Sequence, residues 1–132
     1  MASINNAELT ITTDRPQDRA TLVVSCDVNF TEVEVNAMDI LGLRYTLHCQ
    51  VLNKDLLEED PVVSFRHQSF PRMAGEARRH EHAVFETNVP MDNLHERLIG
   101  KDKLVAQLKL KDEETGKEDV KRTEALAVDL AV

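Results

Sequence analysis

Three segments of this sequence alternate apolar and polar side chains with a period of two residues. This period places successive side chains on opposite faces of an extended chain, whereas a helix repeats about every 3.6 residues. Each segment therefore predicts a β-strand with one buried and one solvent-facing side. The expected inward residues are Leu22, Val24, Cys26, Val28 and Phe30, then Leu43, Tyr45, Leu47, Cys49 and Val51, then Leu104, Ala106, Leu108 and Leu110. The expected outward residues of the second segment are Arg44, Thr46, His48 and Gln50.

Glycine and proline separate these segments from four less regular ones. All four glycines and all four prolines fall between apolar segments, so they divide the chain into about seven units of strand length. The weaker strands are expected at Glu8–Thr13, at Val62–Phe70, around His80 to Phe85 and after Lys117. Prolines at both ends of Val62–Phe70 are typical of an edge strand.

The pattern predicts an all-β protein, an immunoglobulin-like Greek-key β-sandwich of about seven antiparallel strands formed as a single domain over residues 1–132. The likeness is one of architecture, because the chain has no Trp and its cysteines do not lie where antibody-type domains place them. One fold hosts many functions, so the architecture alone indicates no activity.

One or two short helical crossovers are expected between strands. Thr31 and Glu34 form a capping-box pattern, followed by Val33, Ala37 and Ile40 at helical spacing and by Gly42 as a stop. The same residues could instead extend the preceding strand. Asp92 is a candidate cap for a second turn of helix that carries Leu94 and Leu98.

The last hairpin has a predicted register. A four-residue loop over 113–116, with Gly116 in the left-handed conformation, sets Asp112 opposite Lys117 and Lys111 opposite Glu118. The apolar pattern then changes face along the final strand. A β-bulge near Glu124 would reconcile its two halves.

Composition excludes several classes of partner. The formal net charge of −8 repels nucleic acid and anionic membranes, and the small number of aromatic side chains removes the stacking surfaces that carbohydrate and single-strand binders use. No apolar run is long enough to span a bilayer, and residues 1–12 do not resemble a signal peptide. Cytoplasmic residence is therefore expected.

Catalytic sequence motifs are absent. There is no Gly-rich phosphate loop, nucleophile elbow, paired Cys-x-x-Cys or two-His zinc helix, so we expect a non-catalytic module without a cofactor. The acidic residues Asp55, Glu58, Glu59 and Asp60 are interpreted as a solvated turn, with a C2-like calcium-binding module as a third possible function.

Two histidines provide the alternative function. His80 and His82 are two residues apart and so share one face of a strand, which suits a metal-binding protein or metal-dependent enzyme. If Val62–Phe70 pairs with this strand as a hairpin, Phe65 lies opposite Phe85 and Gln68 lies beside His82, while His67 faces the core. This arrangement offers no clear third ligand.

The two cysteines are expected on inward faces of opposing sheets. Cys26 and Cys49 are therefore predicted to be buried free thiols, although a disulfide across the core is the alternative.

The 64–82 region carries the leading functional hypothesis. It is a basic stretch on an acidic chain, and it contains Arg66, Arg72, Arg78 and Arg79 against Glu76 and Glu81. Residues 27–39 hold acidic side chains and no basic ones, so the two segments could meet between copies of the chain. We expect a structural or interaction module that binds another protein, or itself, through this region. The alternative is that the arginines decorate a mobile loop.

Overall fold

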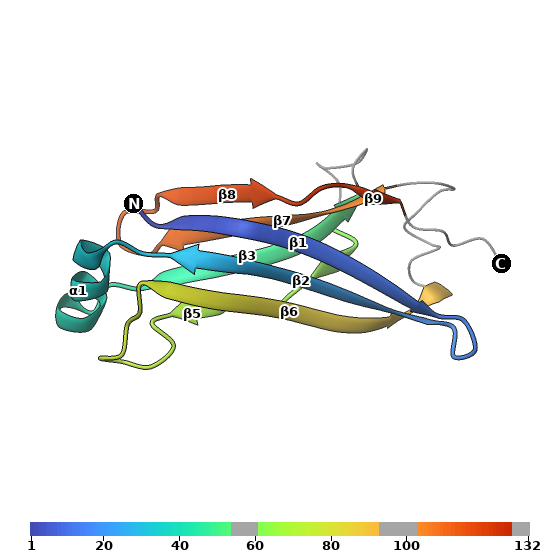
Figure 1. Cartoon of the computed structure of the whole chain (residues 1–132), viewed down its shortest axis with the longest axis horizontal. Helices are drawn as coiled ribbons and strands as arrows, with labels where there is room; N and C mark the ends of the chain where they lie inside the picture. Colours follow the sequence, from blue (N-terminus) through green and yellow to red (C-terminus); the bar gives the residue numbers. More distant parts are fainter. Residues whose placement is uncertain (54–60, 93–102, 128–132) are drawn as a thin grey trace.

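A computed structural model describes residues 1–53, 61–92 and 103–127. Within these residues the chain forms two antiparallel sheets that pack face to face as a β-sandwich, with helix α1 at one end (Figure 1). The first sheet has the order β1-β2-β6, and the second has β4-β3-β7-β8, with β5 also on β3 and β9 also on β7. The elements are β1 (Ser3–Asp14), β2 (Arg19–Asn29), α1 (Glu32–Leu41), β3 (Tyr45–Asn53), β4 (Val63–Ser64), β5 (Gln68–Phe70), β6 (His80–Pro90), β7 (Lys103–Asp112), β8 (Glu118–Arg122) and β9 (Leu126–Ala127).

The period-two pattern predicted the facing of the three main strands. Along β2 and into Phe30 just after it, every second residue from Ala20 is buried, and the residues between them are partly exposed. Along β7, the buried inward residues are Leu104, Ala106, Leu108 and Leu110, as expected. On β3 the inward side chains are also buried, but Thr46 departs from the prediction. It is 9% exposed because β5 and β7 flank it on both sides, with Ser69 and Lys111 as its paired residues.

The predicted hairpin between Val62–Phe70 and the histidine strand is wrong. Both β4 and β5 pair with β3 in the second sheet, whereas β6 pairs with β2 in the first. Phe65 and Phe85 therefore do not face each other across a hairpin, although their rings meet across the sandwich at 5.7 Å between centroids. His67 was expected to face the core and is exposed instead, on the outer side of the second sheet.

The helix forms where the capping box predicted it. The Thr31 hydroxyl accepts a hydrogen bond from Glu34 N at 3.2 Å, and Glu34 Oε1 accepts one from Thr31 N at 2.8 Å. Gly42 ends the helix in the left-handed conformation at φ 72°, which a residue without a Cβ adopts without strain. The second expected helix lies in residues 93–102, outside the described residues, as does the acidic loop at 55–60.

The final hairpin has the predicted register. Lys111 pairs with Glu118, and Asp112 N donates to Lys117 O at 2.9 Å. The register then shifts by one residue between the Gln107–Arg122 pair and the Leu104–Leu126 pair, which is the irregularity expected near Glu124. Thr123 lies in this interruption, where its hydroxyl accepts from Ala106 N at 3.0 Å.

Strand β1 extends beyond the predicted Glu8–Thr13. A bulge changes which of its residues point inward, so the apolar alternation did not reveal its N-terminal part. Its register to β2 shifts between Asn5 and Glu8, and Asn6 has a positive φ of 54°. Ile4 and Leu9 are both buried although they are five positions apart, an odd number that strict alternation would place on opposite faces. The extra residue reverses the alternation, so no single period of two extends over the whole strand.

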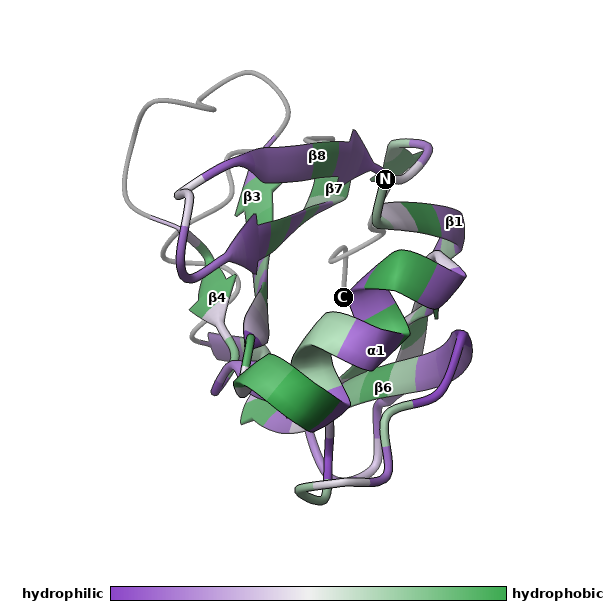
Figure 2. Ribbon diagram, turned by 90° about the vertical axis from the view of Figure 1, so that its left-hand side faces the viewer, coloured by the Kyte–Doolittle hydropathy of each residue, from purple (hydrophilic) through white to green (hydrophobic). Residues whose placement is uncertain are grey.

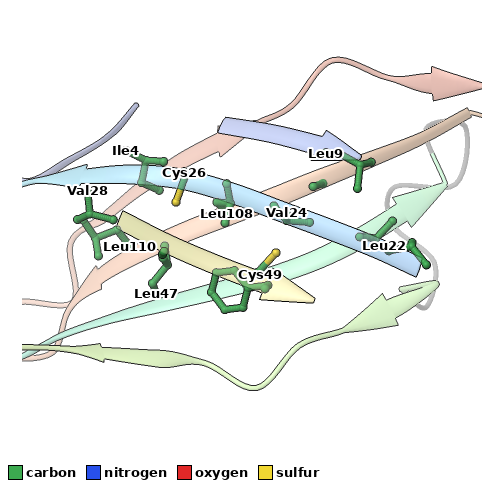
Figure 3. Close-up of a cluster of buried hydrophobic side chains, with 14 of the residues drawn as sticks. Ile4, Leu9, Leu22, Val24, Cys26, Val28, Leu47, Cys49, Leu108 and Leu110 are labelled. Carbon is green, nitrogen blue, oxygen red and sulfur yellow. The ribbon is translucent and has the colours of Figure 1, made fainter. Parts of the chain in front are cut away.

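The core lies between the two sheets and contains both cysteines (Figure 3). Cys26 on β2 and Cys49 on β3 are each 1% exposed, and both are free thiols. Burial raises the pKa of Cys26 to about 11 and that of Cys49 to about 12.

Because only the thiolate reacts readily, neither cysteine is expected to react with a maleimide or aromatic disulfide reagent in the folded protein at neutral pH. Both should react after denaturation in guanidinium. Mass spectrometry of the labelled chain measures this directly. Rapid labelling without denaturant, or an intact mass two hydrogens lighter, would contradict the assignment.

Candidate interaction surface

The loop that joins β5 to β6 is fixed against the helix end of the sandwich. Phe30 N donates to Arg79 O at 2.7 Å, and Ala77 N donates to the Asp39 carboxylate of α1 at 2.9 Å. Glu76 N also donates to Met73 O at 3.1 Å, which closes a turn around Gly75. The acidic 27–39 segment and the basic loop therefore lie side by side in one molecule, as the end-on view shows (Figure 2).

The four arginines of the sequence hypothesis are all exposed, but they differ in what they contact. Arg72 donates to His82 O at 2.9 Å and lies over the Phe70 ring at 4.9 Å from its centroid. Arg66 lies between β4 and β5, outside the 71–79 loop. Within the described residues, the guanidinium groups of Arg78 and Arg79 have no hydrogen-bond or ion-pair partner. Arg66 is likewise exposed and without such a partner, but of these three only Arg78 and Arg79 lie on the 71–79 loop.

Strand β6 is an edge of the first sheet, and two side chains of the 68–72 segment cover part of that edge. Gln68 Nε2 donates to Val84 O at 2.9 Å, two residues along the strand from the His82 carbonyl that Arg72 occupies. Unpaired carbonyls on an edge strand are the groups to which another strand would bind. Around His82 and Val84, a partner strand would have to displace these side chains.

His80 and His82 share the outer face of the first sheet, as predicted. Their ring nitrogens lie against residues of β2: His80 Nδ1 is 2.5 Å from Asn29 Oδ1, and His82 Nδ1 is 2.8 Å from Asp27 Oδ1. Asn6 donates to the other Asp27 oxygen at 2.8 Å. The hydrogen bond from Asn6, followed by that from His82, holds the pKa of Asp27 below its usual value.

These contacts form a row of cross-strand polar pairs. Across the described parts of the chain, no three His, Cys, Asp or Glu side chains are placed to hold a metal ion together. On the other sheet, the rings of His48 and His67 meet at 5.6 Å between centroids with a tilt of 45°, and both side chains are exposed. The sequence reasoning missed this pair because it placed Val62–Phe70 in the wrong sheet.

The sequence reasoning also missed an exposed apolar face on α1. Val33 and Ile40 are each 77% exposed and Leu41 is 81% exposed, while Met73 in the neighbouring loop is 64% exposed. The buried side of the helix is formed instead by Met38, with Val35 partly buried against the core. The spacing of Val33, Ala37 and Ile40 predicted the helix, but Val33 and Ile40 point to solvent and Ala37 is only partly buried.

Comparisons with known proteins show a similar fold and no related sequence. No protein-family model and no curated protein matches this sequence. Among solved structures, the chain is similar to a bacterial adhesin from Mobiluncus mulieris that contains intramolecular disulfide, isopeptide and ester bond cross-links. The TM-score is 0.58 at 16% sequence identity, over 99% of this chain and 50% of that one.

This likeness agrees with the β-sandwich seen here, and this chain spans half the length of the adhesin chain. At such low identity, no residue role is carried over from it. No helix among the described residues has the length and apolar character to cross a bilayer.

Proposed function

We propose that this chain is a non-catalytic β-sandwich module that binds another protein, or a second copy of itself, through the 64–82 region. The observation that carries the proposal is the fixed placement of Arg78 and Arg79. Hydrogen bonds from Ala77 N and to Arg79 O hold the backbone around both residues, while their guanidinium groups remain exposed. A loop that is already ordered loses little conformational freedom on binding, which favours recognition.

Charge supports an acidic partner surface. The loop is basic on a chain with a net charge of −8, so it attracts a carboxylate-rich surface that the acidic parts of the chain repel. A guanidinium group holds a carboxylate with two parallel hydrogen bonds. The adhesin with a similar fold provides a precedent for a sandwich of this shape in an adhesive protein. Because Arg72 and Gln68 already occupy carbonyls of β6, we assign recognition to the loop side chains.

Replacing both Arg78 and Arg79 by glutamate is expected to abolish binding and leave thermal stability nearly unchanged, because exposed charges contribute little to folding. Recovery of partners from a lysate by the immobilised chain, with identification by mass spectrometry, measures the loss. Binding by the unaltered chain should also weaken as salt concentration rises.

A double variant, Lys103→Glu with Lys121→Glu, is the matched control. Both lysines are exposed on the second sheet, and the substitutions change net charge by the same amount. The control should keep the recovered proteins that the arginine variant loses. Equal recovery by all three chains, with an unaltered oligomeric state, would remove the loop from consideration.

A further inference from the structure

The outer face of the first sheet is acidic. Glu8 on β1, Asp27 on β2 and Glu86 on β6 all point away from the core, because the residue that adjoins each of them in its strand is buried. The two glutamates are exposed, and 41% of the Asp27 side chain is exposed. Arg19, the basic residue at an outward position of these strands, pairs with Asp14 across β1 and β2, so their charges offset each other. Three carboxylates therefore remain without a balancing lysine or arginine at the described outward positions.

The outer face of the second sheet is basic. Lys109 and Lys111 on β7 alternate with buried leucines, and they line a hollow on this face. Arg122 on β8 is exposed on the same side, and Lys103 adds a further positive charge at the far end of β7. Glu118, which pairs with Lys111, is the acidic residue at the described outward positions of β3, β7 and β8. The two outer faces of one molecule therefore carry opposite charges.

Each face also exposes a valine among its charged residues. Val84 is 46% exposed on β6, two residues from Glu86, and Val120 is 45% exposed on β8, two residues from Arg122. Both valines point outward with these charged residues, because the period of a strand is two. Contact between the two faces would remove both valines from water while it brings carboxylates against ammonium and guanidinium groups.

We infer that copies of this chain associate head to tail, with the outer face of the first sheet of one copy against the outer face of the second sheet of the next. The 71–79 loop takes no part in this contact, so the inference goes beyond the proposed function. Because the two contacting surfaces differ, each added copy leaves one face of either kind free. The assembly can therefore lengthen beyond a dimer.

The charge on the whole chain limits how strong this association is. The net charge of −8 opposes association at long range. At about 0.15 M salt the Debye length is only about 8 Å, so groups near the contact dominate, and there the two faces carry opposite charges. Exposed ion pairs each contribute little, which predicts a dissociation constant of about 0.1 mM or above. Raising the salt concentration to about 1 M shortens the Debye length to about 3 Å and should suppress the association.

Sedimentation velocity over a concentration series tests the contact. The unaltered chain should form dimers and longer species as its concentration rises. The double variant Lys109→Glu with Arg122→Glu gives both faces a net negative charge, and its dissociation constant should be higher by roughly tenfold or more.

The matched control is Lys117→Glu with Lys121→Glu, which changes the net charge by the same amount. Lys117 precedes β8 in the hairpin, and Lys121 lies on the side of β8 opposite to Arg122, so both exposed lysines lie off the basic face. This control should associate as the unaltered chain does.

Reversal of the acidic face supplies an independent test. The double variant Glu8→Lys with Glu86→Lys gives both faces a net positive charge, and this chain should also fail to associate. An equimolar mixture of the two face-reversed chains again presents acidic faces to basic ones, so the mixture should associate although neither chain does so alone. Circular dichroism verifies that each variant keeps its fold, as substitutions on outer faces usually allow.

The inference would be overturned by an unaltered chain that stays monomeric at millimolar concentration, by face-reversed chains that still associate, or by a mixture of them that does not. Association that stops at a dimer would overturn the head-to-tail arrangement. The Arg78→Glu, Arg79→Glu variant separates this inference from the proposed function, because it should self-associate as the unaltered chain does while it loses its lysate partners. Failure of the face contact would leave the loop to be judged by partner recovery alone.

Discussion

Replacing Leu47 by alanine is expected to lower the free energy of unfolding by about 2–5 kcal/mol, the range for truncating a fully buried leucine. Leu47 is 0% exposed and lies on β3, where it pairs with Gln68 of β5 on one side and with Leu110 of β7 on the other. Strands on both sides limit how far the surroundings can collapse into the cavity. Urea denaturation followed by circular dichroism measures the loss.

His48→Ala is the matched control, since His48 is the next residue on the same strand and points to solvent. It should change stability by less than about 0.5 kcal/mol, as surface substitutions usually do. Thr46 is a poorer control, because flanking strands leave it only 9% exposed. Similar losses at positions 47 and 48 would contradict the facing of β3.

Replacing Glu34 by alanine is expected to lower the free energy of unfolding by about 2–4 kcal/mol. The Glu34 side chain is 16% exposed, and its carboxylate accepts hydrogen bonds from Thr31 N, Thr31 Oγ1, Ala2 N and Tyr45 OH. Its loss removes half of the capping box and leaves the Tyr45 hydroxyl and Ala2 N–H without this acceptor. Thermal and urea denaturation both measure the effect.

Glu32→Ala supplies the control, because Glu32 is an exposed acidic residue in the same first turn. Its removal deletes the same charge near the helix N-terminus and should cost only a few tenths of a kcal/mol to about 1 kcal/mol. A loss at position 34 no larger than that at position 32 would mean that the carboxylate contacts do not stabilise the fold.

The contribution of Glu34 should also depend on pH. Burial alone raises the pKa of this carboxyl, but the hydrogen bonds from Thr31, Tyr45 and Ala2 outweigh burial and hold the pKa below its ordinary value of 4.5. A carboxyl whose pKa is lower in the folded state stabilises the protein fully above its unfolded pKa, and that stability is lost as pH falls through the folded value. The difference in unfolding free energy between the unaltered chain and Glu34→Gln should therefore shrink below about pH 4.5.

Local patterns predicted those parts of the fold that depend on neighbouring residues. The alternation along 22–30 and 104–110 reports directly which side of a strand is buried, and the 113–116 loop limits the register of β7 and β8. The capping box at Thr31 likewise involves residues within one turn. In each case the interacting groups lie close together in the sequence.

The pairing of Val62–Phe70 could not be predicted in this way. A short strand bounded by prolines fits the edge of either sheet, and the choice depends on distant contacts such as the Tyr45–Phe70 pair and the Phe30–Phe70 ring contact. The bulge at Asn6 has a similar cause, since it is defined by the partner strand. The bulge reverses the apolar alternation within β1, so the sequence pattern predicted only the part of the strand after it.

The candidate surface was predicted only in part. The sequence located the arginines, but it did not distinguish Arg72, which is held by His82 O and Phe70, from Arg78 and Arg79. The partners of His80 and His82 depend on the register between β2 and β6, which no local signal supplies. The helical spacing of Val33, Ala37 and Ile40 can be seen in the sequence. However, α1 has apolar residues on two sides, and the sequence does not indicate which side packs against the core.

The side chains that cover the edges of the first sheet have a consequence for aggregation. On one edge, Gln68 and Arg72 bind carbonyls of β6, and on the other, the Asp119 carboxylate of β8 accepts from Ile4 N at 2.8 Å. Gln68, Arg72 and Asp119, which make these edge contacts, all lie outside the first sheet. These parts of the two edges are therefore covered only while the two sheets remain docked. A molecule that opens locally uncovers strands able to recruit further copies into a growing fibre. Variants that weaken the packing between the two sheets, such as Leu47→Ala, are therefore expected to aggregate faster than their loss of stability alone would predict.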